Sequence, residues 1–169
     1  MQTTPGHETL ARLTPLGKVP LLVLDDGWKI PESTIIVEYL DTRVATGTRL
    51  IPDDRDLARQ TRFHDRLADL YVTEPVVALH FQRGDQAAAH ARLDTLFTGF
   101  DANLAKRTWI MGDAFTLADC SLIPALRYAT QLHPFDKWRH LSAYFARASE
   151  RPSVREVYDE LAPHLAKSA

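Results

Sequence analysis

The chain has 169 residues, of which 45% are apolar, so it is long enough for one domain or one and a half and can form a sizeable core. Its formal net charge of -2, without a run of Lys and Arg, gives no support to a nucleic acid or an anionic membrane as partner. The single cysteine, Cys120, cannot form an intrachain disulfide, no apolar run approaches the roughly 18 residues of a membrane span, and a cytoplasmic location is the simplest interpretation.

The first part of the chain predicts a short helix and a β-hairpin. Residues 7–13 form the predicted helix, and the loop LTPLGKVP follows it. The apolar run at residues 21–24 has the length of a strand, and the sequence DDG at residues 25–27 is typical of a turn. Residues 28–30 therefore return as the second strand of the hairpin.

After Pro31, which ends the second strand, the pattern changes to that of a helix. Ser33 is its predicted N-cap, and apolar residues recur at helical spacing as far as about Arg43. Residues 44–53 mix small, turn-forming and apolar residues and predict a linker. The predicted first domain therefore covers residues 1–43.

Beyond the linker the strand signals disappear, and residues 54–169 predict an all-helical domain. Pro75 is expected to kink or break the first of its helices, because proline lacks the amide hydrogen that an α-helix uses. The spacing of apolar residues predicts five helices, which begin near residues 54, 86, 116, 137 and 153. The first, second, fourth and fifth are expected to end near residues 81, 104, 148 and 167.

Several common site motifs are absent from the sequence. It contains no GxGxxG, no GxxxxGK[ST], no GxSxG, no HExxH and no CxxC, and its seven histidines show no pair at the close spacing of a helical metal site. The sequence therefore predicts no metal.

The tripeptide Lys18-Val19-Pro20 precedes the first strand, where a proline removes a hydrogen bond from the ladder. If the Val19–Pro20 bond is cis, the Val19 amide and carbonyl are presented to solvent, where an extended peptide could pair with them. The alternative is an ordinary trans proline, since only about 5–6% of X–Pro bonds in folded proteins are cis. The residues alone leave both interpretations open.

Glu32 and Ser33 precede the predicted helix of the first domain. A helix N-terminus attracts a carboxylate, with the Ser33 hydroxyl and the free amides as donors, and Glu32 could hold an ammonium group beside it. Together they could bind the end of an α-amino acid, which carries both charges. The alternative is a purely structural N-cap.

Thr116 and Asp119 form the S/T-x-x-D/E pattern of a capping box, in which each side chain bonds the backbone amide of the other residue. We interpret this box as structural. Cys120, directly after it, is predicted to be a small buried core residue and not a nucleophile, because no clear electropositive setting surrounds it.

Two stretches together resemble one family. PLGKVPLLVLDDGWKIPESTIIVEYLD is similar to the second half of the thioredoxin-like domain of cytosolic glutathione transferases, and GDAFTLADCSLIPAL resembles the box of their helical domain. The motifs occur in the family's order, and the resemblance covers nearly the whole chain. It implies an α+β/α fold class, in which an incomplete thioredoxin-like domain precedes an all-α glutathione-transferase helical bundle.

The resemblance also implies a ligand, reduced glutathione. Pro20 matches the family's cis-proline, and the Val19 backbone would pair with the cysteinyl part of glutathione. Glu32 and Ser33 would hold the γ-glutamyl end, and Lys18 could meet the glycyl carboxylate.

The implied reaction is attack of the glutathione thiolate on an electrophile. The electrophile pocket is expected between the proline loop and the first and third helices of the bundle, although each candidate residue could instead be a core or solvated position. A homodimer and a cytoplasmic location are further expectations from the family. The pocket candidates are Phe63, Leu67, Tyr71, Arg127 and Tyr128.

The family's first strand–helix–strand unit, of roughly 30 residues, has no counterpart before the KVP motif. That unit carries the residue that contacts the glutathione sulfur, so no catalytic residue is assigned. The chain could be naturally shortened, with a partner subunit over the open strand edge, or it could be a fragment or a gene model that starts late. One alternative function is a non-catalytic binding or dimerising scaffold, and another is a helical regulatory domain unrelated to glutathione.

From the missing sulfur-contacting residue we predict that the chain, as written, has little or no conjugating activity. The measurement is turnover of glutathione with a standard electrophilic aryl halide by the purified chain. Robust turnover would contradict this expectation.

Overall fold

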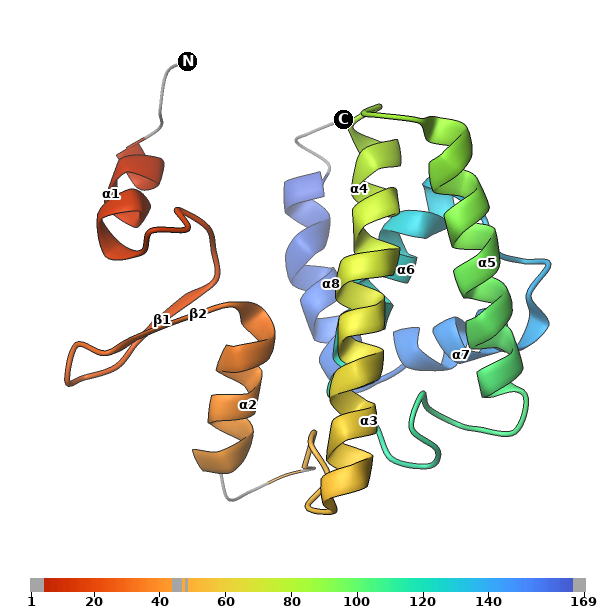
Figure 1. Cartoon of the computed structure of the whole chain (residues 1–169), viewed down its shortest axis with the longest axis horizontal. Helices are drawn as coiled ribbons and strands as arrows, with labels where there is room; N and C mark the ends of the chain where they lie inside the picture. The colour runs from red at the N-terminus through yellow and green to blue at the C-terminus, as the bar shows by residue number, and fades with distance from the viewer. Residues whose placement is uncertain (1–4, 44–46, 48, 166–169) are drawn as a thin grey trace. The chain divides into compact units, whose positions relative to one another are not determined.

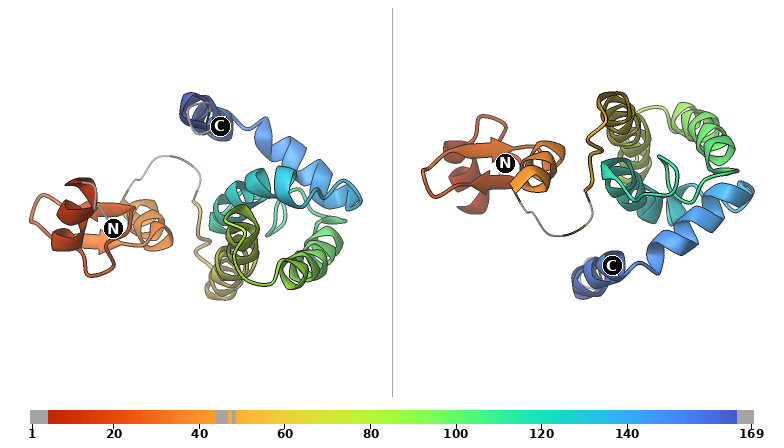
Figure 2. Two further views of the ribbon diagram at one scale, coloured as in Figure 1. Left: turned by 90° about the horizontal axis from the view of Figure 1, so that it is seen from above. Right: turned by 90° about the horizontal axis from the view of Figure 1, so that it is seen from below.

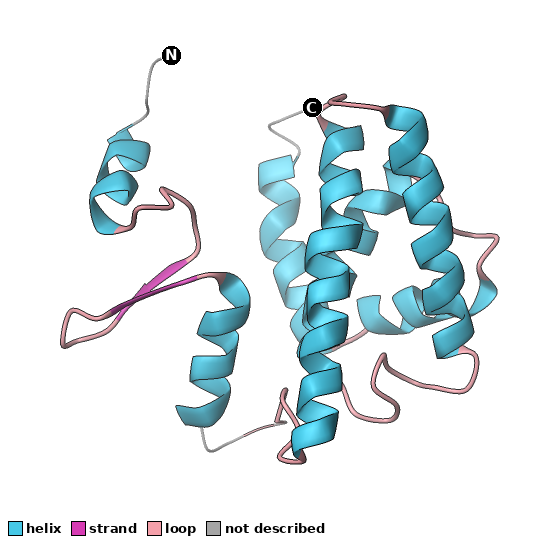
Figure 3. Cartoon of the chain, in the orientation of Figure 1, coloured by secondary structure: helices cyan, strands magenta, loops and turns pink. Residues whose placement is uncertain are grey.

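The computed structural model describes residues 5–43, 47 and 49–165. The chain divides into two compact units, Met1–Pro52 and Asp53–Ala169 (Figure 1). The first unit contains the short sheet and two helices, and the second is helical throughout its described elements (Figure 3).

The first unit is built on a β-hairpin that follows helix α1 (Pro5–Leu13). Strand β1 (Leu21–Val23) pairs antiparallel with β2 (Lys29–Pro31), and Leu22 lies opposite Ile30 in the register. Pro31 is the last residue of the second strand, where the ladder loses least from a missing amide hydrogen.

The turn of the hairpin follows from its sequence, DDG. Gly27 has a φ of 83°, a left-handed conformation that glycine adopts without the cost of a Cβ atom. Its amide donates to the Leu24 carbonyl at 2.8 Å, and the Trp28 amide donates to the Asp26 carboxylate at 2.9 Å. These bonds close the loop and set the register of the two strands.

Helix α2 (Ser33–Arg43) follows the second strand directly. The prediction that Ser33 caps this helix is wrong. Ser33 is its first residue, and the Glu32 carbonyl accepts the first intrahelical bond, from the Ile36 amide at 3.0 Å. The reason is the left-handed backbone of Glu32, with a φ of 73°, which turns the chain into the helix one residue earlier than the side-chain pattern suggests.

The Asp41 side chain of α2 binds the segment at residues 49–51, which follows that helix in the sequence. The Asp41 carboxylate accepts from the amides of Leu50 at 2.7 Å and Ile51 at 3.2 Å. It also accepts from the Arg49 guanidinium at 3.2 Å, and the Asp41 side chain is only 4% exposed. Three donors thus satisfy one carboxylate, as its burial requires.

The second unit is a bundle of helices (Figure 2), and buried apolar side chains form its core. Asp54 and Asp85 cap α3 and α5 through their side chains, since an aspartate carboxylate at a helix start can accept from the free backbone amides. Its elements are α3 (Arg55–Arg66), the π-helix η1 (Leu67–Val72), α4 (Thr73–His80), α5 (Gln86–Leu104), α6 (Leu117–Leu132), α7 (Arg139–Ser149) and α8 (Pro152–Leu165).

The first predicted helix of the bundle is continuous but irregular. The irregularity precedes Pro75, because proline gives no amide hydrogen to the preceding turn. The Thr73 amide and hydroxyl both donate to the Ala68 carbonyl, five residues earlier, which is the spacing of a π-helix. The expected break is therefore a widened turn at η1 rather than an interruption.

The core of the bundle is aromatic and aliphatic. Phe97 of α5 lies edge-on to Trp138 and Phe135, with ring centroids 5.3 and 5.6 Å apart. A buried polar contact also crosses the bundle, because the Ser121 hydroxyl of α6 donates to the Asp65 carboxylate of α3. The fully buried apolar side chains include Leu93, Phe97, Ile110, Leu122, Leu126 and Leu141.

Asp119 is the centre of the predicted capping box, and both halves of that box are formed. Its carboxylate accepts from the Thr116 amide at 2.8 Å, the Ile110 amide at 3.0 Å and the Tyr144 hydroxyl at 3.0 Å. Burial raises the pKa of Asp119, and the hydrogen-bond donors oppose that shift. The box is structural, and it also joins α6 to α7 and to the turn at Ile110.

We predict that Asp119→Ala lowers the free energy of unfolding by about 3–5 kcal/mol, because several buried donors lose their acceptor at roughly 1–3 kcal/mol each. Urea unfolding followed by circular dichroism measures the loss. Asp159→Ala, at an exposed position of α8, is the matched control and should change stability by less than about 0.5 kcal/mol. Equal effects of the two substitutions would contradict the role given to Asp119.

Candidate functional site

The tripeptide Lys18-Val19-Pro20 enters the hairpin through a cis peptide bond between Val19 and Pro20, as the family resemblance implies. The Val19 side chain is 78% exposed. Among the described residues, its amide and carbonyl take part in no backbone hydrogen bond, and Lys18 is exposed and forms no ion pair. This segment therefore offers an unused backbone donor and acceptor beside a free cation.

Glu32 and Ser33 are exposed at the start of α2. Within the described part of the chain, neither side chain makes a hydrogen bond or an ion pair, so the Ser33 hydroxyl is not used to cap its own helix. The first amides of a helix have no intrahelical acceptor, and the helix dipole favours an anion there. The pair can thus offer donors to a carboxylate and an acceptor to an ammonium group.

The register of the hairpin brings these two segments to one end of the sheet. Leu21, the residue after Pro20, lies opposite Pro31, the residue before Glu32. The chain therefore enters β1 and leaves β2 at the same end, next to α2 (Figure 1). Residues that the sequence separates by a turn and two strands share one region of the first unit.

An apolar cavity of about 330 Å³ lies between α4 and α6 in the second unit. Of the five predicted electrophile-pocket residues, Tyr128 lines it. The His80 ring lies 6.2 Å from the Tyr128 ring and 4.7 Å from the Phe81 ring, centroid to centroid. The complete lining is Thr73, Val76, Val77, His80, Phe81, Pro124, Ala125 and Tyr128.

The other four candidates lie outside the lining of this cavity. Phe63 on α3 and Tyr71 on η1 are 60% and 51% exposed, and Leu67 is half-buried. The Arg127 guanidinium lies over the Tyr158 ring, 5.5 Å from its centroid. The structure thus brings Tyr128 together with residues that the sequence did not single out.

The spacing of the cavity-lining residues that we did not predict is visible in the sequence, but it fits a closed core as well as a cavity wall. Thr73, Val77 and Phe81 recur every four residues and so share a face of α4. The same spacing is typical of a helix face in a closed core, and only packing against Pro124 and Tyr128 of α6 distinguishes a cavity from a core.

Cys120 does not supply a nucleophile. Burial, together with the neighbouring Asp119 carboxylate, raises the pKa of the Cys120 thiol to about 12. In the described ranges, no group of three or more His, Cys, Asp or Glu side chains is arranged to hold a metal ion. No helix there combines the length and the apolar character needed to cross a membrane.

The hairpin, the cis-proline and the helical bundle define a two-part transferase fold, and comparison with known proteins identifies it. A model described as "Glutathione S-transferase, C-terminal domain" matches residues 65–152, and one described as "Glutathione S-transferase, N-terminal domain" matches residues 2–48. The chain belongs to the glutathione S-transferase family.

Individual relatives agree with this assignment. Glutathione S-transferase hmp2 of Hypomyces subiculosus is 30% identical over 164 residues, which are 86% of this chain and 77% of that protein. The crystal structure of Gtt2 from Saccharomyces cerevisiae has a TM-score of 0.77 at 28% identity and covers 90% of this chain and 79% of its own. A glutathione S-transferase from Methylobacillus flagellatus KT, solved with GSH bound, has a TM-score of 0.77 at 29% identity, and the match covers 87% of this chain and 78% of that chain.

Because the Cys120 thiol is almost entirely protonated, we predict that it resists modification in the folded chain. With a pKa of about 12, roughly one thiol in ten thousand is a thiolate at about pH 8. A chromogenic disulfide reagent should therefore react at least about 100-fold more slowly with the native chain than with the chain unfolded in urea. Modification of the native chain at the rate of a free thiol would contradict this prediction, and Cys120→Ser corrects for background.

Proposed function

We propose that this chain binds reduced glutathione at the end of the hairpin formed by β1 and β2. The Val19 amide and carbonyl pair with the cysteinyl part of the tripeptide, as a neighbouring strand would. Glu32 holds the α-ammonium group of the γ-glutamyl end, and Ser33 with the first amides of α2 holds its carboxylate. Lys18 meets the glycyl carboxylate, and Pro20 orients Val19.

One observation carries this proposal: polar groups of both segments lie unused at the same end of the sheet. The Val19 backbone and the Glu32 and Ser33 side chains have no hydrogen-bond partner in the described residues, and the register places both segments beside each other. Their chemistry complements a peptide with an ammonium group and two carboxylates. The Methylobacillus flagellatus relative, whose crystal structure contains GSH, supports the choice of ligand.

The reaction that we propose is the transfer characteristic of the family, in which the glutathione thiolate attacks an electrophilic carbon and forms a carbon–sulfur bond. Either the leaving group on that carbon departs with the bonding electrons, or the thiolate adds to an activated double bond whose other carbon then takes up a proton. A thiolate is the reactive form, so a nearby donor must lower the pKa of the glutathione thiol. We assign no residue of this chain to that donor, in agreement with the low conjugating activity that the sequence predicts for this chain. The cavity between α4 and α6 holds the electrophile, and its aromatic lining by Phe81 and Tyr128 suits an apolar or aromatic compound.

A homodimer in the cytoplasm is the setting that we propose for this function. The single cysteine, Cys120, is a half-buried free thiol, which is compatible with a reducing compartment. Light scattering of the purified chain tests the dimer.

We predict that Ser33→Ala weakens glutathione binding by about 1–3 kcal/mol, or roughly 5- to 150-fold in Kd, because a carboxylate loses a hydroxyl donor. Isothermal titration calorimetry with reduced glutathione measures the change. Ser153→Ala, at an exposed position of α8 in the other unit, is the matched control and should leave the affinity unchanged. An unchanged affinity of the Ser33→Ala variant would overturn the assignment of this helix start to glutathione.

A further inference from the structure

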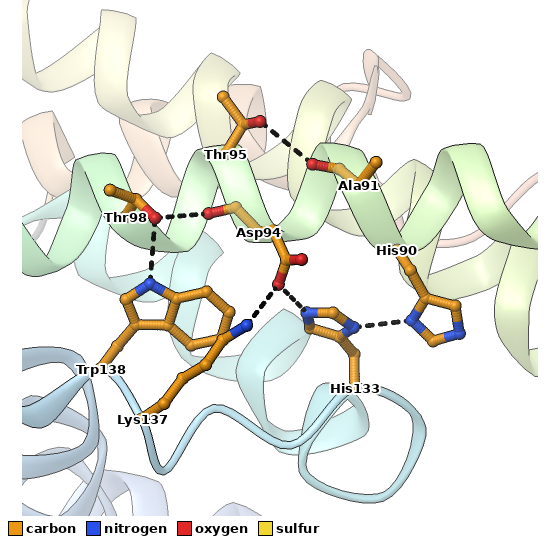
Figure 4. A network of polar contacts seen from close by, with 8 residues as sticks. All are labelled: His90, Ala91, Asp94, Thr95, Thr98, His133, Lys137 and Trp138. Carbon is orange, nitrogen blue, oxygen red and sulfur yellow. Dashed lines mark hydrogen bonds and ion pairs between the residues drawn. The ribbon is translucent and has the colours of Figure 1, made fainter.

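Two histidine rings face each other in the second unit, one from α5 and one from the residue after α6 (Figure 4). The Nδ1 atoms of His90 and His133 are 2.7 Å apart. The other ring nitrogen of His133, Nε2, lies 3.1 Å from Oδ1 of Asp94, and the Lys137 ammonium donates to the same oxygen at 2.9 Å. Asp94, His133 and His90 thus form a chain of hydrogen bonds from carboxylate to imidazole to imidazole.

The positions of the protons follow from the chemistry of these groups. The hydrogen bond from Lys137 lowers the pKa of Asp94, so that carboxylate is ionised and can only accept. Nε2 of His133 must therefore carry a proton, and Nδ1 of neutral His133 is an acceptor. Because one of two facing nitrogens must donate, Nδ1 of His90 carries the proton between the rings.

The pair can take up one extra proton without losing this contact. If His90 becomes an imidazolium through its Nε2, its Nδ1 still donates to His133. If His133 becomes the cation, its Nδ1 donates to a His90 ring protonated on the other nitrogen. With two extra protons, both Nδ1 atoms carry hydrogen and two cations face each other with ring centroids 4.9 Å apart, so the contact cannot persist.

The contact holds the first residue of the α6–α7 segment, residues 133–138, against α5. The same segment is attached to α5 further along, where the Trp138 indole donates to the Thr98 hydroxyl at 3.0 Å. The start of α7 is attached beyond it, since the Asp101 carboxylate accepts from the His140 and Leu141 amides at 2.7 and 2.9 Å. Within residues 133–138, the contacts of His133 and Lys137 with Asp94 on α5 therefore depend on charge, whereas the contact between Trp138 and Thr98 does not.

We propose that the His90–His133 contact is an acid-sensitive latch, which holds the α6–α7 segment on α5 while the pair carries at most one extra proton and opens when a second proton binds. The device belongs to the helical unit alone and does not rest on glutathione binding.

The direction of the effect follows from the charges around the rings. Burial lowers the pKa of His133, although the Asp94 carboxylate opposes the shift. A group whose pKa is lowered in the closed state stabilises that state above its ordinary value of about 6.5, and the stabilisation is lost as the pH falls through the lowered value. The positive charge of Lys137 also lowers the pKa of His133, because it repels a protonated ring. Arg139 and His140, at the start of α7, are exposed to solvent.

The first test uses the unmodified full chain with ¹⁵N-labelled histidine. Two-bond ¹H–¹⁵N spectra report which ring nitrogen is protonated. At about pH 8 we expect the Nε2–H tautomer for His133 and the Nδ1–H tautomer for His90. Finding His90 as the Nε2–H tautomer there would overturn the proton arrangement on which the latch depends.

The second test measures opening, by amide hydrogen-exchange protection of the α6–α7 segment. Between about pH 7 and pH 4.5 we expect protection to fall by at least about tenfold, the equivalent of one pKa unit. His90→Gln should abolish this fall, because a carboxamide can donate to His133 or accept from it and so remains paired in either state. His140→Gln is the matched control and should behave as the wild type. Constant protection in the wild type, or an equal fall in His90→Gln, would overturn the proposal.

Discussion

The architecture of the helical unit depends on one buried carboxylate. A charge removed from water is costly unless hydrogen bonds replace its hydration, so Asp119 is tolerated only where its donors converge. Those donors come from separate parts of the chain: the Thr116 amide at the start of α6, the Ile110 amide in the preceding turn and the Tyr144 hydroxyl on α7. Satisfying the charge therefore fixes the start of α6, the turn and α7 relative to one another.

The two units use polar groups in opposite ways. In the bundle, the buried carboxylates of Asp65 and Asp119 are matched by donors, and their effect is structural. At the end of the hairpin, the Val19 backbone and the Ser33 hydroxyl have no partner in the described residues. A protein that binds a charged peptide needs such groups to be exposed and held in place, and a short hairpin followed at once by a helix provides both.

Local signals predicted much of the fold. The hairpin, α5 and the capping box at Thr116 each depend on interactions between residues close in sequence, such as turn glycines, N-cap side chains and helical periodicity. The cap of α2 was predicted wrongly for the same reason, since the left-handed backbone at Glu32 is not a property of the side chain that a pattern describes. The segments of the candidate site were predictable only because their motifs resemble those of a known family.

By itself, the sequence determined which segments form helices and which form the hairpin, and which family the chain resembles, because caps, turns and periodicity act over a few residues. Only the tertiary structure decided which distant side chains meet. The cavity joins Val77 to Tyr128, and the facing rings of His90 and His133 are separated by 43 positions in the sequence. Such contacts depend on how whole helices pack, and no local pattern specifies the face that a neighbouring helix will cover.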